Sequence, residues 1–101
     1  AWQVEVDVPS PQTVTALPAT AGQRIAWEPR LYQQYPDSQF PHLVFSGTVQ
    51  AKDVAAGAST SFARETFTGL AEGPRWVAGG LLTWLVGDQV LGTYEFIYIP
   101  L

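Results

Sequence analysis

Cysteine is absent from this 101-residue chain, and so are methionine and asparagine. The absence of cysteine excludes disulfides, thiolate metal sites and cysteine nucleophiles, although it leaves the redox compartment open. The absence of asparagine excludes N-linked glycans. The fold must therefore be stable without disulfide bonds or thiolate-bound metals.

Charge is also scarce, because only 14% of the residues are charged and the formal net charge is -4. The basic residues are spread along the chain and do not form the stripe that nucleic-acid binding requires, so we expect no nucleic-acid partner. No apolar run reaches the roughly 18 residues needed to cross a bilayer, so we expect no membrane insertion. The longest such run, 76–91, is interrupted by glycines and Asp88.

What the chain does contain is apolar and aromatic side chains, at 47% and 13% of its residues. A chain of this length buries roughly 60 to 65% of the surface that its unfolded form exposes. We therefore expect residues 1–101 to form a single domain with its own core.

Alternation with a period of two runs through most of the chain and predicts strands. It is strictest at the N-terminus, where Trp2, Val4, Val6 and Val8 share one face before two prolines end the segment. Gly87-Asp88 predicts a hairpin between two long segments. The loop at 31–41 is the longest that we expect. The further predicted strands are 12–17, 23–30, 42–50, 61–68, 75–86 and 89–99.

No segment shows a sustained helical stripe, and about seven short strands with turns between them are typical of a two-sheet sandwich. The sequence thus predicts an all-β fold, an immunoglobulin-like antiparallel β-sandwich of about seven strands, with a small β-barrel as the alternative. The Cys, Trp, Cys spacing of true immunoglobulin domains is missing, so the prediction concerns the architecture only.

Residues with catalytic potential are few and isolated. His42 is the only histidine, no serine lies in a nucleophile elbow, and the acidic residues form no calcium loop. Glu5 and Asp7 share a strand face, and alternating acidic residues on an exposed face usually contribute only to solubility. We therefore predict that the chain is not an enzyme and has no catalytic residue, metal site or cofactor.

The aromatic residues divide into two groups. Trp27 and Trp84 fall in apolar strand patterns and are predicted core residues. Tyr32, Tyr35 and Trp76 lie where exposure is expected, and are the candidate contacts for a carbohydrate or a protein partner. The alternative is a loop packed over the core by its own tyrosines.

The chain ends indicate self-association, because edge strands are normally protected by lysine and this chain has a single lysine. The strand at 1–8 could be exchanged with a neighbouring copy, which makes Trp2, Val4, Val6 and Val8 candidate assembly contacts. The segment 94–101 is almost uncharged. Alternatively, both terminal strands pair within their own sandwich.

These patterns predict a non-catalytic structural module. We expect a subunit or decoration of a larger extracellular, cell-surface or virion assembly, formed with copies of itself or with another protein through β-edge and apolar contacts. The alternative is a carbohydrate- or protein-binding module, including one that inhibits a protease through an exposed loop.

Overall fold

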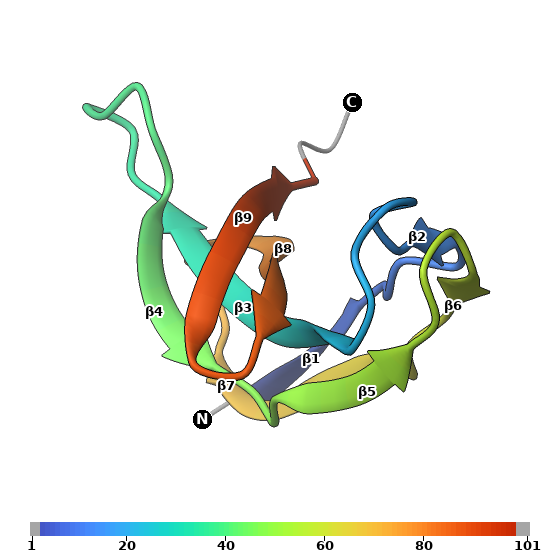
Figure 1. Ribbon diagram of the computed structural model, residues 1–101. Helices are drawn as coiled ribbons and strands as arrows, with labels where there is room; N and C mark the ends of the chain where they lie inside the picture. The colour runs from blue at the N-terminus through green and yellow to red at the C-terminus, as the bar shows by residue number, and fades with distance from the viewer. Residues whose placement is uncertain (1–2, 99–101) are drawn as a thin grey trace.

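A computed structural model of the chain describes residues 3–98 and shows an all-β fold with antiparallel sheets and no helix in that range (Figure 1). The strands are β1 (Gln3–Val8), β2 (Val14–Thr15), β3 (Gln23–Gln34), β4 (His42–Ser46), β5 (Gln50–Val54), β6 (Ser59–Thr60), β7 (Glu65–Ala71), β8 (Arg75–Val86) and β9 (Gln89–Ile97). The predicted fold class is confirmed at this level.

The largest sheet has five strands in the order β4-β3-β8-β9, with β5 pairing with β3. Two smaller sheets, β1-β7 and β2-β6, contain two strands each. Every pairing is antiparallel, and no sheet formed by residues 3–98 closes into a barrel.

The hairpin predicted at Gly87-Asp88 is confirmed and joins β8 to β9. Gly87 has a φ of 57°, in the left-handed region that primed turns require and that glycine adopts without strain. The predicted limits of β8 also agree with the structure.

Strand β3 continues to Gln34, so the prediction that it ends at Arg30 and that a loop starts at 31 is wrong. Pro29 lies inside the strand, where a missing N–H group normally breaks a ladder. Its carbonyl accepts a bond from the Gly47 N–H at 2.7 Å, so this edge of Pro29 faces the gap between β4 and β5. The proline is tolerated because the partner strand is interrupted there.

The same gap divides the strand predicted at 42–50. Both β4 and β5 pair with β3, but in different registers: Arg30 lies opposite Ser46 and Trp27 lies opposite Gln50. The segment 47–49 absorbs the difference between the two registers. The two halves of β3 therefore have different neighbours on this edge.

The core lies on the side of the five-stranded sheet that carries Ile25, Trp27 and Leu31, here called the core face. Trp27 is 0% exposed, as predicted. Its indole lies over Gly80 of β8, where an added Cβ would collide with the ring. The core cluster comprises Val8, Val14, Ala16, Ile25, Trp27, Val54, Phe62 and Leu82. It draws on the five-stranded sheet, on β1 and β2, and on the segment around β6.

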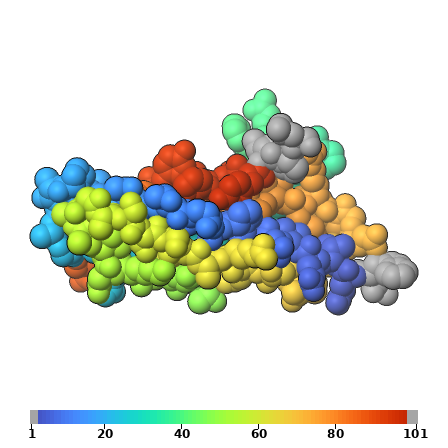
Figure 2. Space-filling model, turned by 90° about the vertical axis from the view of Figure 1, so that its right-hand side faces the viewer, coloured from blue at the N-terminus to red at the C-terminus, as the bar shows by residue number. Residues whose placement is uncertain are grey.

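The N-terminal strand pairs with β7 of its own chain, from Gln3 opposite Ala71 to Val8 opposite Glu65. The ladder shifts register between Val4 and Val6, and Gly69 on β7 has a φ of 69° there, which is typical of a bulge. The turn predicted at 69–74 therefore begins only after Ala71. Figure 2 shows the N-terminal residues in blue between β9 in red and the yellow strands around β7.

The molecule is elongated, with principal extents of 50 × 26 × 25 Å. A long shape leaves much of the sheet perimeter in solvent. Strand β4 has β3 as its principal partner, and β9 has β8. Both are outer strands of the five-stranded sheet; in Figure 1 β4 curves along the left and β9 passes in front of β3.

Candidate functional site

Tyr32 was predicted to lie in a loop, but the structure places it in β3, where it is only 3% exposed. Its ring packs over Gly79, where a Cβ would come within 2.8 Å of the ring carbon Cε2. It lies on the side of the sheet opposite Trp27, here called the outer face, because neighbouring strand residues alternate. A buried ring of this kind is not available for stacking on a ligand.

The Tyr32 hydroxyl belongs to a polar cluster on the outer face. It donates to Glu95 Oε2 at 2.9 Å, and Arg30 Nη1 donates to the same oxygen at 3.1 Å. Arg30 also pairs with Glu28 at 3.2 Å. Burial raises the pKa of Tyr32, Glu95 adds to the rise, and Arg30 opposes it. The phenol thus remains a hydrogen-bond donor, and the cluster ties β3 to β9 across β8.

The other two candidate ligand contacts point to different places. Trp76 on β8 is half-buried, lies 6.2 Å from the Phe45 ring, and donates its indole N–H to the Ala71 carbonyl at 3.1 Å. Tyr35 is exposed just after β3, with its ring 5.1 Å from His42. The structure therefore does not bring Tyr32, Tyr35 and Trp76 together into one site.

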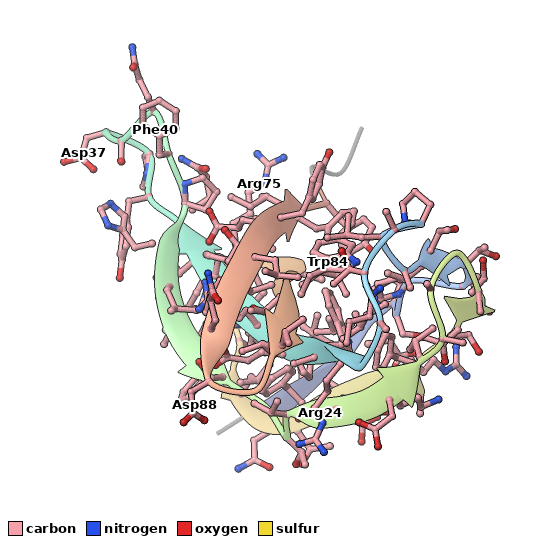
Figure 3. All side chains as sticks on the ribbon, in the orientation of Figure 1. Arg24, Asp37, Phe40, Arg75, Trp84 and Asp88 are labelled. Atoms are coloured by element: carbon pink, nitrogen blue, oxygen red, sulfur yellow. The ribbon has the colours of Figure 1, made fainter. Side chains whose placement is uncertain are left out.

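Tyr35 instead helps to line an open hollow of about 520 Å³ beside the hairpin between β3 and β4. The walls come from the hairpin, the start of β8 and the end of β9. Figure 3 shows Phe40 at the hairpin tip and Arg75 between the hairpin and β9. Phe40 is 73% exposed. The lining is mostly apolar with one cation, Arg75, and sequence reasoning did not identify Phe40 or Arg75 as members of a site.

Strand β4 is unusual because all five of its residues are exposed. Leu43, Val44 and Phe45 follow one another, so apolar side chains project from both faces of this edge strand. No charged residue protects the strand, whereas the neighbouring β5 carries Lys52 and Asp53. The signal in the sequence was an apolar triplet without charge, which was interpreted only as part of a longer strand.

Strand β9 is the opposite edge and carries an aromatic row. Tyr94, Phe96 and Tyr98 lie at alternate positions, with centroid distances of 4.5 Å between the first pair of rings and 6.4 Å between the second. Tyr94 is 57% exposed. The weakly charged C-terminal strand predicted from the sequence therefore does lie at an edge of the sheet.

Trp84 was predicted to be core and is only half-buried. It reaches from β8 toward β2, as Figure 3 shows, and its indole N–H donates to the Thr15 carbonyl at 3.2 Å. With Tyr94 and Phe96 it lines a shallow groove of about 340 Å³ between β9 and residues 11–15. The polar end of the indole accounts for its position at the margin of the core.

The candidate assembly contacts of the N-terminal strand face the chain's own interior. Val8 is fully buried in the core cluster, and Val4 and Val6 are half-buried in the β1-β7 pair. Trp2 lies outside the described residues. Strand β1 therefore buries its valines, wholly or in part, within its own chain.

The isolated polar residues make ordinary surface contacts. His42 Nε2 lies 3.2 Å from Ser38 Oγ, and Thr66 bonds to Asp7 across the β1-β7 pair. Within residues 3–98 no group of three or more acidic or histidine residues is placed to hold a metal ion. The same range contains no helix long and apolar enough to span a membrane.

Comparison with protein-family models, with curated proteins and with solved structures found no match for this chain. The candidate surfaces are therefore defined by their own geometry: the two apolar edges of the five-stranded sheet and the hollow beside the hairpin.

Proposed function

We propose that this chain is a non-catalytic assembly module, an immunoglobulin-like two-sheet β-sandwich that joins copies of itself into a larger extracellular, cell-surface or virion structure. The observation that carries the proposal is β4, an edge strand exposed along its whole length with three consecutive apolar residues. An unprotected edge presents free backbone donors and acceptors, which pair with another strand when one is available.

The arrangement of the core supports the sandwich part of the proposal. Side chains from β1, β2 and the region of β6 meet the core face of the five-stranded sheet around Trp27. This is how two sheet layers share a core. Among the described residues, β4 and β9 are then the outer strands of the five-stranded sheet.

The free energy of burying apolar side chains favours association through the edge at β4. Leu43, Val44, Phe45 and Val49 are all exposed large apolar residues on or next to β4. Each fully buried side chain of this kind contributes about 1.5 to 3 kcal/mol. Several together can offset part of the entropy lost on association, while edge hydrogen bonds set the geometry.

Light scattering coupled to size exclusion, over a wide range of protein concentration, tests this function. We expect the mass to rise from the monomer value of 11.0 kDa to multiples of it as concentration increases. A mass that remains monomeric at the highest soluble concentration would remove self-assembly as the function.

The hollow beside the hairpin favours a second candidate function, the binding of a carbohydrate or a protein segment. It combines exposed aromatic rings, Tyr35 and Phe40, with the guanidinium of Arg75. Apolar walls with few polar groups are typical of ligand sites. Binding on a glycan array or a peptide array that is lost in Phe40→Ala, with the melting temperature unchanged, is the expected result for this candidate.

A further inference from the structure

We propose that copies of this chain associate head to tail, with β4 of one copy pairing with β9 of the next. This inference rests on the proposed assembly function and specifies which surfaces meet. It begins from the order of the five-stranded sheet, in which β4 and β9 are the outer strands of the path β4-β3-β8-β9.

The two edges run in opposite directions. Each neighbouring pair along this path is antiparallel, and three such steps separate β4 from β9. When a second copy is placed beside the first in the same orientation, its β4 therefore lies antiparallel to the β9 it meets. The antiparallel pattern of the sheet can then continue across the junction once the second copy is also turned to follow the twist of the sheet.

The side chains of the two edges match in character. Phe45 lies opposite Leu31 on β3, so it projects from the core face. Phe96 and Tyr94 lie opposite Gly80 and Leu82 on β8, so they project from the same face. Head-to-tail pairing therefore brings an aromatic side chain of β4 to the side of the sheet that carries the aromatic row of β9.

Charge does not oppose this contact. Strand β4 carries no acidic or basic residue apart from His42, and Glu95 is the only charged residue of β9. The Glu95 carboxylate lies on the outer face and is already bound to Arg30 and Tyr32 of its own chain. An incoming β4 would not have to neutralise it.

Pairing of either edge with itself is less favourable. Val44 is the extra residue between the Leu31–Phe45 and Tyr32–Leu43 pairs, so the bulge lies at the centre of β4. A two-fold β4-β4 contact would set two bulges opposite each other, where the ladder is disrupted. A β9-β9 contact centred on its regular segment, 92–97, would bring two Glu95 carboxylates near the symmetry axis, where like charges repel.

An interface between two different surfaces does not close after one contact. Each copy added to β4 or β9 presents the same free edge again, so the product is an open linear array unless a rotation closes a ring. Both edges carry exposed side chains in the monomer, Val44 on β4 and Tyr94 on β9 among them.

A complementation experiment with two edge variants tests the proposal. Val44→Lys introduces a charge on β4 and leaves β9 intact, whereas Tyr94→Lys introduces a charge on β9 and leaves β4 intact; both positions are exposed. Ala19→Lys, in the exposed turn between β2 and β3, is the matched control. Light scattering gives the mass of each protein alone and of the mixture.

We expect the wild type and Ala19→Lys to form multiples of the monomer and each edge variant alone to remain monomeric. An equimolar mixture of the two edge variants should form heterodimers of twice the 11.0 kDa monomer mass and nothing larger. Leu43→Lys and Thr93→Lys repeat the test at exposed neighbouring positions, in case a variant loses its β-sheet circular dichroism.

Two results would overturn the head-to-tail arrangement while leaving self-assembly intact. In one, an edge variant still dimerises alone, which shows an edge pairing with itself. In the other, the mixture stays monomeric although the wild type associates. A wild type that is itself monomeric would instead refute the assembly function on which this inference depends.

Discussion

The two halves of β3 carry similar apolar patterns but lie in different surroundings. The half around Ile25 and Trp27 pairs with β5 and β8 and is covered by Val8 and Phe62 in the core cluster. The half beyond Pro29 is also buried at Leu31 and Tyr32, but it pairs with β4, whose residues are all exposed. Apolar residues in the first half hold the fold together, whereas those of β4 contribute little to it. The comparison separates the apolar surface that folding requires from the surface that remains available to a partner.

The largest expected effect lies in the covered half. Trp27→Ala removes the largest fully buried side chain and leaves a cavity over Gly80, so it should lower the free energy of unfolding by about 3 to 5 kcal/mol. Trp84→Ala is the matched control, because the same residue type is only half-buried there and should cost clearly less. Urea denaturation of both variants measures the difference. Equal losses of unfolding free energy in the two variants would mean that Trp84 belongs to the core as much as Trp27 does.

An intermediate effect is expected at Tyr32, on the outer face. Its folded pKa is raised above the unfolded value near 10, so the folded state keeps its proton while the unfolded state loses it. The contribution of Tyr32 to the free energy of unfolding is complete below the unfolded pKa and is lost as the pH rises through the folded pKa. Denaturation at pH 8 and at pH 11 should show a smaller decline for Tyr32→Phe than for the wild type. An identical decline would indicate that the phenol ionises freely.

The smallest effect on stability is expected on β4. Val44→Thr replaces an exposed side chain with one of the same shape and should change the free energy of unfolding by less than about 0.5 kcal/mol. It should nevertheless weaken self-association, because it reduces the apolar surface of the edge. Thermal denaturation and light scattering together separate the two effects. A loss of stability close to that of Trp27→Ala would mean that β4 belongs to the folding core.

Local features of this fold were predictable because they depend on neighbouring residues. Alternation located β1 and β8, and Gly87-Asp88 located the hairpin. In each case the signal lies within a few residues of the element that it describes.

The misplaced site residues depend on distant partners. Tyr32 was predicted to lie in a loop because a proline such as Pro29 normally ends a strand. Strand β3 continues only because the facing strand is interrupted there. The partner of the Tyr32 hydroxyl, Glu95, is 63 residues away in the chain. Phe40 lies just before β4 and Arg75 begins β8, and the fold brings both residues to the hollow. No local sequence pattern reveals that such distant segments lie together.

The sequence by itself determined that the chain is all-β, where most strands lie and that Trp27 is a core residue, because alternation and turn residues act locally. Only the tertiary structure decided which strands become edges. Strands β1 and β4 both carry apolar side chains, but β7 and the five-stranded sheet enclose Val8, whereas β3 is the strand of the described residues that pairs with β4. Burial depends on what other segments lie opposite a strand, and that is settled by the arrangement of the whole chain.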